Sequence, residues 1–182
     1  MYLPNILTIL RLLLTPVIVW LIVSGRLTEA FVGCLVAGVT DAADGFLARR
    51  FHWQSALGSY LDPIADKFLL VSLYVTLGVL GYLPAWLAIA VVSRDILIVG
   101  AVLLSWLMGM PMQMRPLPLS KINTGAQVAF ALIVLAEAAF WPGLKPWLLY
   151  GAWIVGALTL VTATHYVILW LKHMASAPEQ HG

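Results

Sequence analysis

Hydrophobic positions along the chain fall into six long windows, separated by short stretches that contain glycine, proline or charged residues. A run of about 20 apolar residues is long enough for a helix to cross about 30 Å of hydrocarbon. The pattern therefore predicts six transmembrane helices, over residues 4–24, 29–50, 57–80, 84–110, 121–140 and 146–172. We expect an all-α integral membrane protein whose six helices form one domain over residues 1–174, followed by a disordered polar tail over residues 175–182.

The composition agrees with a chain that folds in lipid and narrows the range of partners. Hydrophobic residues make up 62% of the chain and charged residues 10%, whereas soluble domains have about 25% charged residues. Ten Lys and Arg against eight Asp and Glu give a net charge of +2, too little for a surface that neutralises nucleic-acid phosphates. With Cys34 as the single cysteine, a bound metal would need oxygen or imidazole ligands.

Basic residues in the predicted connections indicate how the chain is oriented. The second-to-third and fourth-to-fifth connections and the end of the last helix hold Arg49, Arg50, Arg115, Lys121 and Lys172. The opposite side holds Arg26 and Lys145. Basic residues favour the cytoplasmic side, so we expect both termini there, in a bacterial cytoplasmic (inner) membrane.

Four acidic residues flank one predicted connection, between the second and third helices. Asp41 and Asp44 are three residues apart and Asp62 and Asp66 are four apart, so each pair lies on one face of its own helix. Both pairs lie about 6 to 12 Å inward from that connection at 1.5 Å per residue. The spacing therefore predicts four carboxylates at one level, near the cytoplasmic surface.

Four ionised carboxylates at one depth repel one another and lose hydration, so they need positive compensation. Arg49 and Lys67 are near in sequence, but two positive charges do not balance four negative ones. Divalent cations bound by carboxylate oxygens would supply the rest. A single Asp in such a place often stays protonated or caps a helix, but four at this spacing favour a shared metal site.

The first predicted helix carries a polar stripe at the same depth. Asn5, Thr8 and Arg11 recur at three-residue spacing, which places them on one face of the helix. An unpaired guanidinium in lipid is costly, so we expect Arg11 to face the acidic cluster or the phosphate of an anionic ligand.

The fourth and fifth predicted helices add cations and hydrogen-bonding groups. Lys121, Asn123 and Thr124 lie near the start of the fifth helix, at the level of the acids. Arg94 and Asp95 are adjacent in the fourth helix and point about 100° apart, so we expect Arg94 to reach toward the acidic cavity rather than pair with Asp95. We assign Arg94, Lys121, Asn123 and Thr124 to the same phosphate-binding region.

A cavity that combines acids, divalent ions and cations at the level of lipid headgroups suits phosphoryl transfer on a lipid. A carboxylate beside the metals can take the proton of an attacking hydroxyl. The alternative from another class is a divalent cation transporter, which also uses intramembrane acids. The outer halves of the second and third helices are almost wholly apolar, and this favours a one-sided pocket over a pathway through the membrane.

The segment from Asp41 to Asp66 reads DxxDGxxARx8GxxxDxxxD, a pattern that fixes eight residues over 26 positions. This pattern resembles the signature of the CDP-alcohol phosphatidyltransferases. The segments LPNILTILR, SRD and SKINTGAQ resemble the branch of that family that makes phosphatidylglycerophosphate and cardiolipin. The resemblance implies the fold of that family, with six transmembrane helices, a homodimer and an active site at the cytoplasmic leaflet.

The resemblance also implies roles for individual residues. Two divalent cations, Mg²⁺ or Mn²⁺, would be held by Asp41, Asp44, Asp62 and Asp66, and Asp66 would also be the catalytic base. The cytidine diphosphate moiety of CDP-diacylglycerol would be contacted by Asp44, Gly45, Ala48, Arg49, Gly58 and Asp62.

The identity of the acceptor follows less directly. Relatives that accept glycerol 3-phosphate usually show GKxKT and a further Arg, and this chain has SKINT and no such Arg after Asp95. A dianionic acceptor needs those cations more than a monoanionic diester does. We therefore expect the acceptor to be phosphatidylglycerol, with cardiolipin and CMP as products, and the alternative is a phosphatidylglycerophosphate synthase that uses glycerol 3-phosphate.

Overall fold

The computed structural model describes residues 3–51, 56–110, 118–141, 143 and 145–176. Side chains are described within these ranges except at residues 3–7, 41–51, 56–64, 145 and 176. The described part of the chain is helical and contains α1 Leu3–Val23, α2 Leu27–Phe51, α3 Ala56–Val79, α4 Ala85–Leu107, α5 Pro118–Phe140 and α6 Lys145–Ser176. The predicted all-α fold is confirmed, and each helix begins and ends within a few residues of its hydrophobic window.

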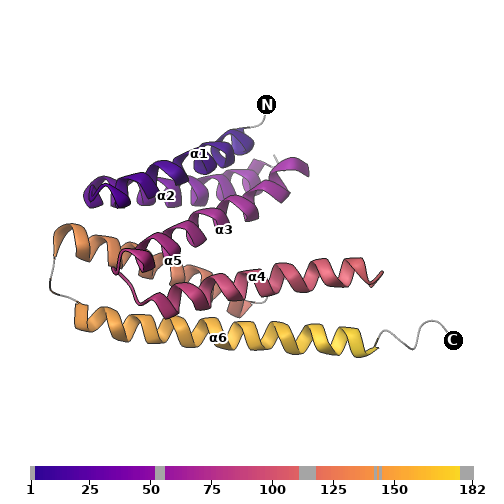
Figure 1. The fold of residues 1–182 in the computed structure, drawn as a ribbon. Helices are drawn as coiled ribbons and strands as arrows, with labels where there is room; N and C mark the ends of the chain where they lie inside the picture. Colours follow the sequence, from indigo (N-terminus) through magenta and orange to yellow (C-terminus); the bar gives the residue numbers. More distant parts are fainter. Residues whose placement is uncertain (1–2, 52–55, 111–117, 142, 144, 177–182) are drawn as a thin grey trace.

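The helices pack as a closed ring in which α1 contacts α3, α3 contacts α4, α4 contacts α6, α6 contacts α5, α5 contacts α2 and α2 contacts α1. Helices α3 and α5 also touch across the ring. Figure 1 shows α4 and α6 side by side along one edge of the bundle, with α1 and α2 along the opposite edge. The start of α1 and the end of α6 lie at the same end of the bundle (Figure 1), and the side of the membrane that this end faces stays a prediction.

Three described segments are long and apolar enough to cross a membrane, namely Ala85–Leu107, Pro118–Phe140 and Pro146–Ala175. The described parts of the first two helices contribute shorter apolar segments, Thr8–Val23 and Leu27–Thr40. The protein is therefore a membrane protein, and crossing of the membrane by all six helices stays a prediction.

Glycines in the left-handed region end two of the helices that form hairpins. Gly25 has φ 74° and Gly81 has φ 75°. In each case the next amide bonds back five residues, from the Arg26 nitrogen to the Leu21 oxygen and from the Tyr82 nitrogen to the Leu77 oxygen, both at 2.9 Å. This is the Schellman arrangement, in which glycine avoids the steric penalty that other residues pay and the last carbonyls of the helix are satisfied.

The last helix is longer than its hydrophobic window. It continues through Ala175 to Ser176, two residues into the segment expected to be disordered. Nothing in Ala175 or Ser176 breaks a helix, and the first residue that cannot donate its amide hydrogen to a helix is Pro178. The rest of the predicted tail lies outside the described residues.

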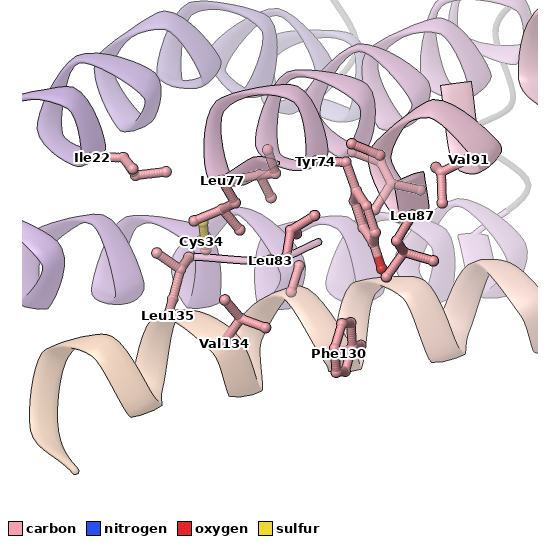
Figure 2. Packing of buried hydrophobic residues seen from close by; sticks show 14 of the residues in the cluster. Ile22, Cys34, Tyr74, Leu77, Leu83, Leu87, Val91, Phe130, Val134 and Leu135 are labelled. Atoms are coloured by element: carbon pink, nitrogen blue, oxygen red, sulfur yellow. The ribbon is translucent and has the colours of Figure 1, made fainter. Parts of the chain in front are cut away.

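The buried core contains residues of all six helices and includes the place where α3 meets α4 and α5. Figure 2 shows Tyr74 and Leu77 of α3 beside Leu87 of α4, above Phe130 and Val134 of α5. The Tyr74 hydroxyl donates a hydrogen bond to the Gln127 carbonyl oxygen at 3.0 Å, so its polar end is satisfied within the bundle.

Helix α6 approaches this core through glycines. A Cβ on Gly151 would lie 2.7 Å from the Phe130 ring, and one on Gly156 would lie 2.6 Å from the Trp86 ring. Small residues at these two positions therefore set the close packing of α6 on α5 and α4.

Candidate functional site

The four acids of the sequence motif lie on α2 and α3 at matching distances from the connection between them. Asp44 and Asp41 precede the end of α2 at Phe51 by seven and ten residues, or about 10 and 15 Å of helix. Asp62 and Asp66 follow the start of α3 at Ala56 by six and ten residues, or about 9 and 15 Å. The helix bounds thus agree with the predicted common depth.

The side chains of Asp41, Asp44 and Asp62 lie outside the described residues, as do those of Ala48 and Arg49. The same holds for Asn5, and the positions of Gly45 and Gly58 are described only as helical backbone. Their predicted roles in metal and CDP binding therefore stay predictions. Asp66 is the member of the acidic motif whose surroundings the structure describes.

Asp66 is paired with a buried arginine of α1. The Arg11 Nη1 donates a hydrogen bond to the Asp66 Oδ1. The Arg11 side chain is 2% exposed, whereas the Asp66 side chain is 46% exposed. The expectation that Arg11 faces the acidic cluster is met at Asp66, and the open face of the carboxylate leaves it accessible to a ligand.

A second group of charges lies next to Asp66 along α3. The Lys67 Nζ is 3.6 Å from the Asp95 Oδ1 of α4, and the Arg94 Nη1 donates to the same oxygen at 2.6 Å. Arg94 also donates to the Ser120 hydroxyl of α5 and lies over the Tyr166 ring of α6, 5.9 Å from its centroid. These contacts join α3, α4, α5 and α6.

The expectation that Arg94 does not pair with Asp95 is wrong. The 100° between adjacent positions fixes only where the two Cβ atoms point, and the guanidinium lies several bonds farther out, so it can turn back to its neighbour. Arg94 is 4% exposed, and within the membrane bundle the nearest carboxylate is the partner that compensates its charge. We call Arg11, Asp66, Lys67, Arg94 and Asp95 the charged layer.

Polar side chains of α5 and α6 form a third buried group. The Thr159 hydroxyl accepts a hydrogen bond from the Gln127 Nε2 at 3.0 Å and donates to the Asn123 Oδ1 at 3.2 Å. Sequence reasoning missed Thr159 and Tyr166. Their signal was the polar stripe of Thr159, Thr162 and Tyr166 on α6, at spacings of three and four residues.

The other residues assigned to phosphate binding differ in exposure. Thr8 is buried, Thr124 is half-buried and Lys121 is exposed. The Thr124 hydroxyl donates to the Ser120 carbonyl oxygen of its own helix at 3.1 Å, which is the usual arrangement of Thr in membrane helices. Thr124 nevertheless lines a cavity that also contacts Arg11.

This cavity, of about 190 Å³, runs between α2, α3 and α5. Arg11 and Asp66 line its polar end. Its remaining wall is largely apolar and consists of Cys34, Ala37, Gly38, Leu69, Leu70, Leu73, Val128 and Leu132, with Thr124. A space with a charged end and an apolar body fits an amphiphile better than a water-soluble molecule.

The donor set at this site suits a hard divalent cation. Asp66 presents a carboxylate that keeps an exposed face, and carboxylate oxygens are preferred ligands of Mg²⁺ and Mn²⁺. Within the described residues, no three His, Cys, Asp or Glu side chains lie close enough to hold a metal. The three further Asp ligands of the prediction fall outside that part of the chain.

The fold and the site define a class: a membrane protein whose described elements are all helices, with the Arg11–Asp66 pair beside an apolar cavity. Residues 1–170 match the family described as CDP-alcohol phosphatidyltransferase. The chain belongs to this family, whose members generally depend on a metal.

Individual relatives refine the comparison. A protein of Drosophila melanogaster named "Probable cardiolipin synthase (CMP-forming)" is 39% identical, over 92% of this chain and 57% of its own length. The human "Cardiolipin synthase (CMP-forming)" is 34% identical, over 75% of this chain and 51% of its own length. A rice protein named "CDP-diacylglycerol--glycerol-3-phosphate 3-phosphatidyltransferase 1, chloroplastic" is 31% identical, over 91% of this chain and 56% of its own length. The chain thus spans about half the length of these relatives.

The contacts of the charged layer indicate that Asp95 contributes to the stability of the protein. Replacement of Asp95 by Asn removes the carboxylate that compensates buried Arg94 and leaves its charge unpaired, so we expect Asp95→Asn to lower the free energy of unfolding by about 3 kcal/mol. Thermal unfolding in detergent checks this. The matched control is Glu29→Gln, which breaks the exposed Arg26 pair and should leave the melting temperature unchanged. Equal melting temperatures for the two variants would contradict the compensating role of Asp95.

Proposed function

We propose that this protein transfers the phosphatidyl group of CDP-diacylglycerol to phosphatidylglycerol and so forms cardiolipin and CMP. The observation that carries the proposal is the cavity that places the Arg11–Asp66 pair at one end of an apolar space. Family membership and the names of the fly and human relatives support the same reaction.

The proposed reaction is an in-line displacement at the phosphorus that bears the diacylglycerol. Asp66 accepts the proton of the acceptor hydroxyl, the hydroxyl oxygen bonds to phosphorus, and the bond to the CMP oxygen breaks. Divalent ions held by Asp41, Asp44, Asp62 and Asp66, two of them and either Mg²⁺ or Mn²⁺, would neutralise the diphosphate when bound. The exposure of Asp66 supports its role, since a base has to reach a substrate.

In this proposal, residues of the acidic motif bind CDP. Residues of other helices bind the acceptor. We assign the cytidine diphosphate to Asp44, Gly45, Ala48, Arg49, Gly58 and Asp62. We assign the acceptor to Asn5, Thr8, Arg11, Arg94, Lys121, Asn123 and Thr124. Among the described residues, the Arg94 Nε and the Asn123 Nδ2 are buried donors without a hydrogen-bond partner, and a bound phosphodiester would satisfy such donors.

The charges near Asp66 favour a monoanionic acceptor. The charged layer contains Arg11, Lys67 and Arg94 against Asp66 and Asp95, so it carries a net charge of +1 (three positive and two negative). Phosphatidylglycerol brings one negative charge and glycerol 3-phosphate brings about two. The rice relative keeps glycerol 3-phosphate as the second candidate acceptor, and the apolar wall of the cavity favours the lipid.

We further propose that the protein acts as a homodimer in a bacterial cytoplasmic membrane, with both termini and the active site on the cytoplasmic side. The excess of basic residues in the connections on that side supports the orientation.

A product assay tests the proposal directly. Purified protein receives CDP-diacylglycerol with Mg²⁺ or Mn²⁺, and phosphatidylglycerol and glycerol 3-phosphate are offered in separate reactions. We expect cardiolipin and CMP from the first reaction, identified by mass, and little product from the second. If phosphatidylglycerophosphate is the main product, the acceptor is glycerol 3-phosphate and not phosphatidylglycerol. If neither acceptor gives a product, the proposed activity is refuted.

The cavity allows a second prediction, because Gly38 lines it and no atom lies within 4 Å of the place of a Cβ. A Leu there would displace about four methylene groups of an acyl chain, worth about 3 kcal/mol of burial. We therefore expect Gly38→Leu to lower kcat/KM about 100-fold, and substrates with short chains to relieve the effect. The substrate whose shorter acyl chains restore kcat/KM in Gly38→Leu is the one whose chain lies in the cavity.

The matched control for this variant is Gly100→Leu on α4, where a Cβ also meets nothing within 4 Å but the residue does not line the cavity. It should retain near-normal kcat/KM. If both variants are equally active, the cavity does not hold an acyl chain.

A further inference from the structure

The guanidinium of Arg94 has partners on α4, α5 and α6. Its Nη1 donates to the Asp95 Oδ1 at 2.6 Å, and its Nη2 donates to the Ser120 hydroxyl of α5. The guanidinium also lies over the Tyr166 ring, 5.9 Å from its centroid. Among the described residues, its buried Nε has no hydrogen-bond partner. Arg94 is thus held at both terminal nitrogens, and Nε keeps a donor to offer.

Ser120 is the most accessible of the two hydrogen-bond partners. Its side chain is half-buried, whereas Arg94 is 4% exposed and Asp95 is 6% exposed. Ser120 lies in the first turn of α5, which begins at Pro118, and the exposed Lys121 follows it. The hydrogen bond between Ser120 and Arg94 therefore lies where the charged layer approaches the surface of the bundle.

The hydrogen bond to Ser120 limits how Arg94 can hold a phosphate. A guanidinium holds a phosphate at two points through one of two edges, which present Nε with Nη2 or Nη1 with Nη2. Both edges include Nη2, so the Ser120 hydroxyl competes with a phosphate at the nitrogen that they share. A dianionic phosphate monoester gains more from a second charge-assisted hydrogen bond than a monoanionic phosphodiester does, because its oxygens carry more charge.

We propose that Ser120 is a specificity-determining residue, whose hydroxyl holds the Arg94 Nη2 and so favours a phosphodiester acceptor over a phosphate monoester. The inference rests on the proposed function, since it presupposes that Arg94 contacts the phosphate of the acceptor. It adds a residue to those assigned to the acceptor, and this residue acts through Arg94 rather than by contact with the substrate.

Kinetics with two acceptors test this role. The measurement is kcat/KM for glycerol 3-phosphate and for phosphatidylglycerol, with CDP-diacylglycerol and Mg²⁺ present. Because a hydrogen bond to a charged group changes an equilibrium about tenfold or more, we expect Ser120→Ala to raise the ratio of the first kcat/KM to the second about tenfold. Ser120→Thr keeps the hydroxyl and should keep the ratio of the unmodified protein.

The matched control is Thr76→Ala on α3. It also removes a half-buried hydroxyl, but this one donates to the Ser72 carbonyl oxygen of its own helix at 2.7 Å. The control should leave the ratio unchanged. Thermal unfolding in detergent establishes that each variant is folded. If Ser120→Ala does not fold, Ser120→Cys decides by the same ratio, because a thiol keeps the volume but accepts hydrogen bonds weakly.

Arg94→Lys separates action through Arg94 from direct contact with the acceptor. Lys keeps the charge but has no planar fork, so the addition of Ser120→Ala to Arg94→Lys should change the ratio by less than about twofold. The same tenfold change in this background would show that Ser120 acts independently of Arg94 and would overturn the inference.

Two further results would overturn the inference. One is an unchanged ratio in Ser120→Ala, and the other is a lower kcat/KM for phosphatidylglycerol without a gain for glycerol 3-phosphate, which would make Ser120 a direct ligand of the acceptor. The unmodified protein tests the proposed function separately. If it uses neither acceptor, that function fails, whereas a preference for phosphatidylglycerol that Ser120→Ala does not alter refutes the inference alone.

Discussion

A charged side chain inside an apolar helix bundle has to find its compensating charge within that bundle, and the arrangement of the site follows from this constraint. Three of the buried charged side chains that the structure describes, Arg11, Arg94 and Asp95, meet in the charged layer, where Arg11 pairs with Asp66 and where Arg94 and Lys67 share Asp95. The buried Glu137 instead accepts a hydrogen bond from the Gly143 amide. The Arg11–Asp66 pair joins α1 to α3, and the Lys67–Asp95 pair joins α3 to α4, whereas Arg94 and Asp95 are neighbours in α4. The contacts that compensate these charges therefore also fix α1, α3 and α4 relative to one another.

The layer also explains why the site suits a lipid substrate. Arg11 and Asp66 line the same cavity as the apolar side chains of Leu70, Leu73 and Val128, and we assign the headgroup phosphate to the charged part of this lining. A molecule that satisfies both surfaces has a phosphate and a hydrocarbon chain. The low net charge of the layer favours an acceptor with a single negative charge, in agreement with the absence of the further cations expected for glycerol 3-phosphate.

Much of this could be predicted from local features of the sequence. Hydrophobic length predicted the helices within a few residues, and the spacing of the acids predicted that both pairs lie at matching distances from the connection between α2 and α3, because rise per residue is constant along a helix. Prediction failed where a long side chain reaches beyond its Cβ, as Arg94 does toward Asp95. Contacts between helices that are distant in the sequence were not predicted either. The Thr159 link between Asn123 and Gln127 and the cavity wall beside Gly38 depend on how α2, α5 and α6 pack.

We propose that carboxylates of α2 and α3 share bound divalent cations at the level of Asp66. Electron paramagnetic resonance of the protein loaded with Mn²⁺ in lipid nanodiscs tests it most directly. We expect two Mn²⁺ ions per chain with a spin-coupled signal, as for ions about 4 Å apart, and loss of the coupling in Asp66→Asn. Absence of bound Mn²⁺, or two ions whose signals are those of isolated sites, would contradict it.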